Sequence, residues 1–367
     1  RGRYNARTGA AMTIKVGIIG ASFAKAAYLP ALANIPDAEV VAIASNRLES
    51  AQAAADAFNV PNAYDNWERM LDSHELDLVG IATPPIYHAD MALKALDNGA
   101  HVLCEKPMAM DADESQKMLD RAVAQGKLHI MGHELRFNPT RKKLKSLLDE
   151  GAIGQVQFAT VVNISPSWGD PASRPYNAWW SDVKMGGGRL GANGSHQIDL
   201  IRWWLGDIGA INGDIRTLVP NRIGKDNGES FTATADDYTQ YQMEMQSGAV
   251  VNMVLTGAAR HNMGNHVQIF GTEGTILLSN SDEVLRVARA GEDFEQITFN
   301  DPNAALPYVG KGIWNVSFVA LMQELTAAIR EERALNEGAT FEDGLATQLA
   351  MDAVRQSSVE RRWIQLD

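Results

Sequence analysis

The sequence contains a single cysteine, Cys104, among its 367 residues. No disulfide can therefore form within the chain and no cysteine cluster can hold a metal, so we expect a protein of the reducing cytoplasm without a metal site. No run of about eighteen apolar residues occurs, which predicts that nothing spans a membrane. Basic residues number 33 against 45 acidic ones, and the net charge of −12 argues against nucleic acid or an anionic membrane as a partner. A local basic pocket for a phosphate is compatible with this charge.

The chain also lacks internal repeats and low-complexity tracts. Its hydrophobic content of 45% and charged content of 21% are those of an ordinary globular protein, and its length suits two domains with separate cores. Residues 1–11 have no apolar periodicity and precede Met12. We expect them to be a cloning remnant or a disordered leader, with a transit peptide as the weaker alternative.

Short apolar strands alternate with helices in the first third of the chain. This pattern predicts a doubly wound α/β domain over residues 12–135, with a parallel sheet covered on both faces. The expected strands are Ile14–Ile19, Val40–Ala44, Leu78–Ala82, His101–Cys104 and an apolar run at Leu128–Gly132, and the helices between them are Ala24–Ala33, Leu48–Phe58, Trp67–Leu71 and Tyr87–Leu96.

The pattern changes after about Phe137, where a helix with a basic face is expected at Arg141–Leu148. The runs that follow alternate apolar and polar residues and are separated by turn sequences, which predicts an open, mostly antiparallel sheet. With a helix inserted at Ser195–Leu205, residues 136–312 are expected to form an α+β domain, and residues 313–367 two closing helices. The expected strands are Val156–Asn163, Tyr238–Met245, Ala249–Thr256, His266–Phe270, Thr275–Leu278 and Val284–Arg289.

The first strand–helix turn carries part of a dinucleotide-binding fingerprint. Gly20 supplies the first glycine, but Ser22 and Lys25 stand where the second and third belong. Ser22 can still donate its hydroxyl and backbone N–H to a phosphate at the start of the helix. An ordinary turn is the alternative. The cofactor-binding candidates of this turn are Gly20, Ala21, Ser22 and Phe23.

The second strand ends in Ser45-Asn46-Arg47, without the acid that NAD-binding folds usually place on the ribose 2′-hydroxyl. A hydroxyl and a guanidinium suit a 2′-phosphate instead, because arginine forms charge-assisted bonds with phosphate oxygens. We therefore expect NADP as the cofactor, with NAD as the alternative if Arg47 is simply solvated.

Two later strand ends also carry polar groups. Pro84 and Pro85 force the chain out of helix after one strand, and His88 follows in the next helical turn, where it would face the nicotinamide. The strand that ends at Cys104 is followed by Glu105 and Lys106. Ligands of parallel sheets bind beyond the carboxyl ends of the strands, so Lys106 is a candidate catalytic residue. The alternative is a surface lysine beside a turn proline. The cofactor-binding candidates at these two strand ends are Thr83, Pro84, Pro85, His88, Glu105 and Lys106.

A glycine-rich stretch marks a second candidate site. Five glycines occur in the nine residues from Gly186 to Gly194, where they allow close approach of the backbone to a ligand. His196 follows at the start of a helix, with Asp199 one turn on; a helix-start histidine satisfied by the backbone is the alternative. Upstream lies an aromatic and polar cluster typical of a sugar-sized pocket, although a domain-interface core is an equally good interpretation of its aromatic rings. The substrate-binding candidates are Arg136, Arg174, Tyr176, Trp179, Trp180, Asn193 and His196.

Together these stretches resemble the glucose–fructose oxidoreductase, inositol dehydrogenase and MocA superfamily (Gfo/Idh/MocA) over nearly the whole chain from Lys15. The resemblance is carried by the order and spacing of GIIG at 17–20, IATPPIYH at 81–88, HVLCEKP at 101–107, RFNP at 136–139, GGG at 186–188, GSHQID at 194–199, FGTEGT at 270–275 and FEDGLATQLAMDAV at 341–354.

The resemblance implies a Rossmann domain, a second domain with an open sheet, and oxidation of a sugar, polyol or glycoside hydroxyl by a nicotinamide cofactor. It also implies that the closing helices pack near the Rossmann domain and that the chain forms a homodimer or homotetramer through the open sheet. Lys106 matches the catalytic lysine of the family and His196 its histidine, which we expect to carry the proton while Asp199 orients it.

One departure from the family pattern is Ala192, which stands where many members carry an aspartate four residues before the histidine. Its absence keeps a second function in view, a nicotinamide-dependent sensor that binds cofactor without turnover. A third is an NAD-assisted glycoside-cleaving enzyme.

Overall fold

The computed structural model describes residues 13–279 and 283–366, so the leader expected at 1–11 lies outside the described residues. Two compact units are formed. The first joins the chain up to Asn138 with Asn300–Leu345, and the second joins Pro139–Phe299 with the chain from Ala346 onward. Each is described by itself below.

The first unit is built on a parallel sheet with the strand order β3-β2-β1-β4-β5-β6. This is the order of a Rossmann sheet, in which the direction of winding reverses between β1 and β4. The predicted doubly wound fold is therefore confirmed. The strands are β1 (Ile14–Ile19), β2 (Ala38–Ala44), β3 (Asn62–Tyr64), β4 (Leu78–Ile81), β5 (His101–Cys104) and β6 (His129–Met131).

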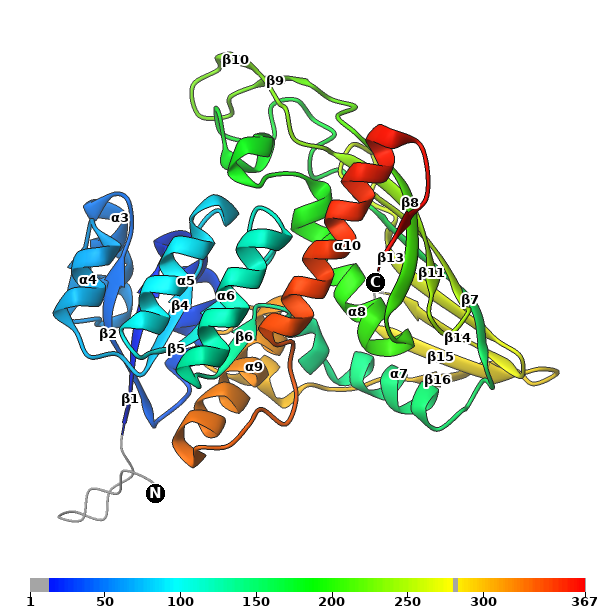
Figure 1. Cartoon of the computed structure of the whole chain (residues 1–367), viewed down its shortest axis with the longest axis horizontal. Coiled ribbons are helices and arrows are strands. Elements are labelled where there is room, and N and C mark those ends of the chain that lie inside the picture. The colour runs from blue at the N-terminus through cyan, green and yellow to red at the C-terminus, as the bar shows by residue number, and fades with distance from the viewer. Residues whose placement is uncertain (1–12, 280–282, 367) are drawn as a thin grey trace. The chain divides into compact units, whose positions relative to one another are not determined.

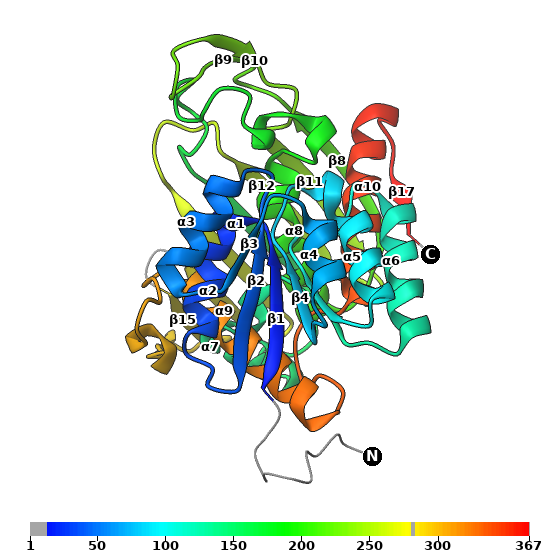
Figure 2. The same cartoon turned by 90° about the vertical axis from the view of Figure 1, so that its left-hand side faces the viewer.

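Helices cover both faces of this sheet, as Figure 2 shows. One face packs against α2 (Leu29–Leu32), α3 (Leu48–Phe58) and α9 (Ile313–Glu331). The other packs against α4 (Trp67–Ser73), α5 (His88–Asp97) and α6 (Ala112–Gln125). Shorter helical segments complete the unit: α1 (Ala21–Phe23), η1 (Ala24–Tyr28), η2 (Pro85–Tyr87), η3 (Glu134–Phe137) and η7 (Pro302–Ala305).

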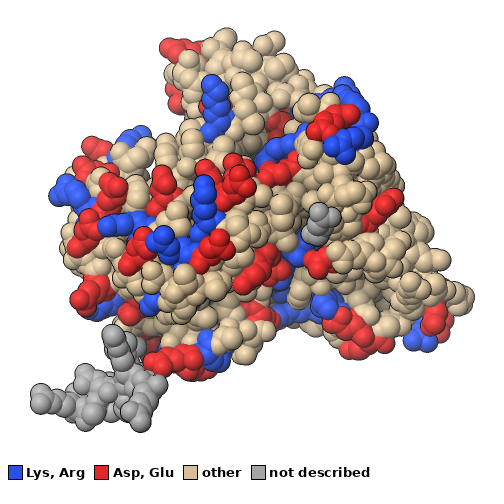
Figure 3. Space-filling model, viewed as in Figure 1, with Lys and Arg blue, Asp and Glu red and all other residues tan. Residues whose placement is uncertain are grey.

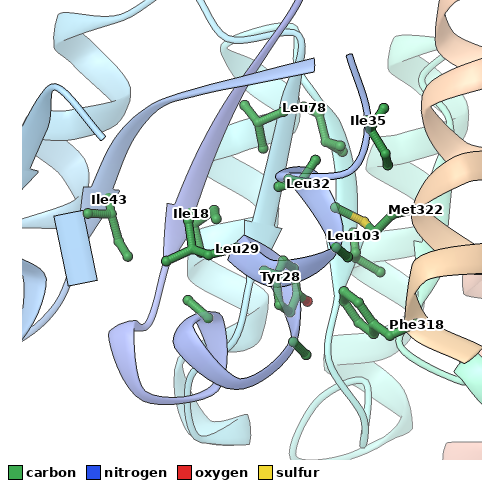
Figure 4. Close-up of a cluster of buried hydrophobic side chains, with 14 of the residues drawn as sticks. Ile18, Tyr28, Leu29, Leu32, Ile35, Ile43, Leu78, Leu103, Phe318 and Met322 are labelled. Atoms are coloured by element: carbon green, nitrogen blue, oxygen red, sulfur yellow. The ribbon is translucent and has the colours of Figure 1, made fainter. Parts of the chain in front are cut away.

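The first helical segment differs from the prediction of a helix at Ala24–Ala33. It begins three residues earlier, at Ala21, and η1 is a π-helical turn between α1 and α2. Such turns are often found at functional sites. Here the turn ends at Tyr28, whose ring is fully buried and lies 4.6 Å, centroid to centroid, from the ring of Phe318 on α9 (Figure 4).

The start of α6 follows directly from its sequence. The Asp111 carboxylate accepts a hydrogen bond of 2.9 Å from the Glu114 backbone N–H, and the Glu114 carboxylate accepts one of 3.1 Å from the N–H of Met110. These two bonds satisfy donors that the helix end leaves without partners. The predicted helix start is confirmed.

The second unit contains a sheet with the order β16-β15-β14-β13-β7-β12-β11-β8-β17. Only the β7–β12 pair is parallel among these described strands, so the predicted open, mostly antiparallel sheet is confirmed. Figure 1 shows these strands side by side. They are β7 (Val156–Ile164), β8 (Ile208–Arg216), β11 (Tyr238–Met245), β12 (Val250–Thr256), β13 (Gly264–Gly271), β14 (Gly274–Ser279), β15 (Val284–Arg289), β16 (Glu295–Ile297) and β17 (Ile364–Gln365).

Further elements of this unit are α7 (Pro139–Asp149), the π-helical turn η6 (Leu190–Gly194), α8 (Ser195–Leu205), the hairpin β9 (Asn221–Ile223) and β10 (Ser230–Thr232), and part of α10 (Phe341–Glu360). The predicted basic face of α7 needs correction at Arg141. Its side chain is 1% exposed and its guanidinium forms a 2.8 Å ion pair with Glu283, because a buried cation requires a partner.

No helix among the described residues is both long and apolar enough to cross a membrane. On the face drawn in Figure 3, acidic and basic side chains are interspersed.

Candidate functional site

The turn after β1 requires its glycine. Gly20 has a φ of 108°, and a Cβ atom there would lie 2.2 Å from the carbonyl oxygen of Ala82, which follows β4. The Gly20 backbone N–H donates to the Ala44 carbonyl at the end of β2. The turn is thus packed between the ends of two strands, beside the point where the winding of the sheet reverses and where such folds bind ligands.

A cavity of about 630 Å³ opens beside this turn. Ala21, Ser22 and Arg47, three of the predicted cofactor-binding residues, line it together with Lys25 and Ser50. The cavity wall also includes Glu49 and Ala53. Two cations therefore face one acid around a space at the carboxyl ends of β1 and β2, which suits an anionic group.

Lys25 and Ser50 were missed by the sequence reasoning, although Lys25 stands where the fingerprint places a glycine. Ser45, Asn46 and Phe23 do not line this cavity. Asn46 is exposed, and the Ser45 backbone N–H donates to Tyr64. Their predicted contacts with the cofactor stay predictions.

Glu105 and Lys106 follow β5 directly, as predicted. The Glu105 carboxylate is 7% exposed and accepts a hydrogen bond of 3.3 Å from the Tyr28 hydroxyl. Burial raises the pKa of Glu105 to about 7, although the nearby Lys106 ammonium and the Tyr28 hydroxyl act to lower it. Lys106 itself is half-buried, and the peptide bond to Pro107 is cis.

His88 takes a role that the sequence did not reveal. Its ring is fully buried, with Nε2 at 2.8 Å from the Thr83 carbonyl and Nδ1 at 3.0 Å from that of Pro107. Burial lowers the pKa of His88. The ring thereby connects the loop after β4 to the loop that carries Lys106. Since both ring nitrogens contact backbone carbonyls, the structure does not support a direct contact of His88 with the nicotinamide.

In the second unit, the glycine-rich stretch is fixed by Asp236. Gly188 has a φ of 122°, and a Cβ atom there would lie 2.1 Å from the Asp236 carboxylate. That carboxylate accepts a 2.8 Å hydrogen bond from the Leu190 backbone N–H, at the start of η6. Burial raises the pKa of Asp236 to about 6. Asp236 was missed because the forty-six residues that separate it from Leu190 leave no local pattern.

The turn η6 leads straight into α8 and presents the predicted residues His196 and Asp199. Their side chains are 2% and 1% exposed. Asn193 on η6 is also buried, and its Oδ1 has no hydrogen-bond partner. Ala192 lies on the same turn as Asn193, so the aspartate that the family often carries is replaced on η6, directly before the helix α8 that holds His196.

The predicted aromatic cluster belongs to the loop between β7 and η6. The rings of Trp179 and Trp180 stack with centroids 3.8 Å apart, and that of Tyr176 meets Phe231 edge-on at 5.5 Å. The Arg174 guanidinium lies over the ring of Trp168, 5.7 Å from its centroid. The stacked tryptophans are half-buried, so they keep surface available for a ligand.

Arg136 is placed differently from its prediction as a substrate-binding residue. In the first unit its guanidinium forms a 2.9 Å ion pair with Asp343 and donates at 3.3 Å to the Gly338 carbonyl. This buried pair ties η3 to the start of α10 and already neutralises the charge. A structural role therefore fits Arg136 better than substrate binding.

Candidate metal ligands do not cluster: within residues 13–279 and 283–366 no group of three or more His, Cys, Asp or Glu side chains could hold a metal ion.

Sequence comparison relates the chain to characterised dehydrogenases. It is 28% identical to levoglucosan dehydrogenase of Pseudarthrobacter phenanthrenivorans, over 96% of this chain and 97% of that one. It is 24% identical to inositol 2-dehydrogenase of Rhizobium meliloti, over 97% of this chain and all of the other.

Solved structures show the same relation. A levoglucosan dehydrogenase in complex with NADH and levoglucosan superposes with a TM-score of 0.86 at 26% identity, covering 97% of this chain and all of that one. An oxidoreductase domain protein from Kribbella flavida superposes with a TM-score of 0.87 at 26% identity and the same coverage.

Two family descriptions match consecutive parts of the chain. Residues 14–133 match the oxidoreductase family with an NAD-binding Rossmann fold, and residues 142–277 match the GFO/IDH/MocA C-terminal domain. With the Rossmann strand order and the open sheet of the second unit, these matches agree with the resemblance seen in the motifs. The chain belongs to the Gfo/Idh/MocA family of NAD-binding oxidoreductases.

Proposed function

We propose that the protein is an NAD(P)-dependent dehydrogenase or reductase that acts on a CH–OH group of a sugar, polyol or glycoside. The observation that carries this is the position of Lys106 directly beyond the end of β5, beside the buried Glu105, in a sheet of the Rossmann order. The full-length likeness to levoglucosan dehydrogenase supports a carbohydrate-like substrate.

The cofactor would be held by the turn from Gly20 to Phe23 and by the cavity beside it. A bound nicotinamide supplies the site that accepts or gives the hydride. We propose NADP as the preferred form, because Lys25 and Arg47 line the cavity and the second strand ends without an acid for the ribose. Levoglucosan dehydrogenase was solved in complex with NADH, so NAD is the alternative that the experiment must test.

The chain's own residues would handle the proton of the substrate hydroxyl. Lys106, half-buried, would polarise the substrate oxygen with its ammonium group. His196 would take or return the proton, since the ordinary pKa of histidine lies near neutrality. Asp199, one turn along α8, would orient the histidine ring.

A substrate panel tests this function. Sugars, polyols and glycosides are offered to the purified protein with NAD⁺ and NADP⁺, and formation of the reduced cofactor is followed by absorbance. Once a substrate is found, Lys106→Ala should lower turnover by about a hundredfold or more, the scale of a lost acid–base or electrostatic group, while cofactor affinity falls much less. Lys117→Ala, at an exposed position on α6, is the matched control. Near-normal turnover of Lys106→Ala would show that this lysine is not catalytic.

The sensor is the second candidate, because Ala192 removes the family aspartate from η6. It predicts normal cofactor binding with no turnover across the panel, together with a cofactor-dependent change in binding to a partner. The glycoside-cleaving alternative predicts a tightly retained cofactor and release of the aglycone. Cofactor absorbance singles out the dehydrogenase, and measurement of aglycone release from the glycosides of the same panel separates the glycoside-cleaving enzyme from the sensor.

A further inference from the structure

Two arginines of the second unit, Arg174 and Arg222, lie over the ring of one tryptophan, Trp168. Trp168 is 4% exposed, and the guanidinium carbons of Arg174 and Arg222 lie 5.7 and 6.0 Å from its ring centroid. Burial and, to a smaller extent, the charge of Arg174 lower the pKa of Arg189 to about 10, although the Asp236 carboxylate acts to raise it. Burial likewise lowers the pKa of Arg174, as does the charge of Arg222. Arg174 is therefore close enough to both other cations for their charges to act on it or for its charge to act on them.

The acids nearby do not neutralise Arg174. Asp237 forms a 3.1 Å ion pair with Arg222 and also accepts hydrogen bonds from two backbone N–H groups. Asp236 accepts from the Leu190 N–H and raises the pKa of Arg189. In the part of the chain that the structure describes, no carboxylate lies within ion-pair distance of the Arg174 guanidinium, and its buried Nε has no hydrogen-bond partner.

An unpaired guanidinium among other cations is costly to keep partly buried. Contact with the Trp168 ring uses only one face of the guanidinium plane and leaves its N–H edges without acceptors. The loop is nevertheless anchored there: the Arg174 carbonyl accepts a 2.9 Å hydrogen bond from Lys225, and the Tyr176 N–H donates to Asp226 at 2.6 Å. The Arg174 guanidinium therefore offers N–H donors at an anchored position, and no carboxylate of the described chain forms an ion pair with it.

We propose that Arg174 binds the carboxylate of the substrate, so that the protein acts on a sugar acid, a uronate or aldonate, rather than on a neutral sugar. The proposal rests on the proposed dehydrogenase function. A carboxylate matches the planar guanidinium edge through two parallel hydrogen bonds. The same unit holds two further buried side-chain atoms that have no hydrogen-bond partner among the described residues, Nε of Arg189, a donor, and Oδ1 of Asn193, an acceptor. Asn193 stands on η6, immediately before the helix that carries His196.

Matched pairs of compounds test the proposal: glucose with glucuronate, galactose with galacturonate, and gluconate as an aldonate, each with NAD⁺ and NADP⁺. We expect kcat/KM to be at least about tenfold higher for the acid of each pair, and Arg174→Gln to remove that preference by raising KM for the acids far more than for the neutral sugars. Arg289→Gln removes a charge at an exposed position of the same unit and should change neither the preference for the acids nor the use of neutral sugars. Glucose 6-phosphate is included to separate a carboxylate from a phosphate.

Binding is measured independently of turnover, as the shift in melting temperature that each compound produces with cofactor present. Acids should stabilise the parent protein, and Arg174→Gln should lose that shift. Equal or better use of neutral sugars, or a stabilisation that Arg174→Gln retains, overturns the proposal, and a clear preference for the phosphate assigns the site to phosphate instead. Failure of every compound to reduce the cofactor overturns the proposed dehydrogenase, whereas the melting shifts still decide whether Arg174 binds a sugar acid.

Discussion

Arg47 is the residue on which the proposed preference for NADP depends. It lies at the start of α3 and shares a cavity with Lys25 and Ser22, and its exposed side chain makes no ion pair among the described residues. A guanidinium in that position can form charge-assisted bonds with a 2′-phosphate, whereas a ribose hydroxyl gains little from it.

We therefore expect NADP(H) to bind at least about tenfold more tightly than NAD(H), equivalent to about 1.4 kcal/mol. Arg47→Ala should remove most of that difference and leave NAD affinity nearly unchanged, as measured by fluorescence or calorimetric titration. Arg69→Ala, a charge removal at an exposed position of the same unit, is the control. Equal affinities in the parent protein would refute the assignment to NADP.

The replacement of the family aspartate by Ala192 bears on His196. If the histidine carries the proton without that carboxylate, we expect Asp199 or a substrate group to take part in stabilising its charged form. We expect His196→Ala to lose at least about a hundredfold in kcat/KM, roughly 2.7 kcal/mol of transition-state stabilisation, and Asp199→Asn to lose less. His261→Ala, at an exposed position, should be neutral. Activity that survives His196→Ala would assign the proton to another group.

At the scale of elements, the short helical segments around the first sheet position the loop after β5. The turn η1 places the Tyr28 hydroxyl against Glu105, and His88 at the start of α5 connects the loops after β4 and β5. Lys106 is therefore held between groups from two other elements, whose side chains are buried. Such support is what keeps a catalytic group in a productive position.

The buried Glu105 gives this arrangement a dependence on pH. Its pKa is raised to about 7 in the folded chain, from an ordinary value of 4.5, so the folded state retains a proton that the unfolded state releases. The stabilisation from this group is complete below about pH 4.5 and is lost as the pH rises towards 7. Glu105→Gln cannot ionise, so its melting temperature should fall less between pH 5 and pH 8 than that of the parent protein. Identical falls in the two proteins would show that Glu105 is ionised in the folded state without cost.

Elements with a strong apolar pattern were predictable from sequence, and those without one were not. The strands Ile14–Ile19 and Val284–Arg289 were found with their observed bounds. The strand β8 was missed because Gly209, Asn212, Gly213 and Asp214 are residues of low strand propensity, and only pairing with β11 makes them a strand.

At the scale of the whole molecule, the sequence predicted the residues at the ends of strands and helices better than the distant residues that contact them. Lys106, Arg47 and His196 could be proposed because each directly follows or begins a recognisable element. The partners Tyr28 and Asp236 could not, because long-range packing brings them to Glu105 and Leu190. The course of the chain was predicted only in part: the resemblance implied that the closing helices pack near the Rossmann domain, and residues 300–345 join the first unit, but the chain from Ala346 onward belongs to the second.

The two-residue strand β17 has a practical consequence for handling the protein. It pairs with β8 through Ile364 and Gln365, and the Leu366 N–H donates to the Gly209 carbonyl at 2.8 Å, so the end of the chain covers part of the outer edge of the large sheet. An uncovered edge offers backbone donors and acceptors to other chains.

A chain that ends at Arg362 should therefore form more soluble oligomers and aggregates than the full chain on storage, as measured by size-exclusion chromatography with light scattering. Gln365→Ala, which keeps the backbone pairing, should behave like the parent protein. If the shortened chain stays as monodisperse as the parent, β17 does not protect the edge. Purification tags that must remain on the protein are accordingly better not fused directly to this strand.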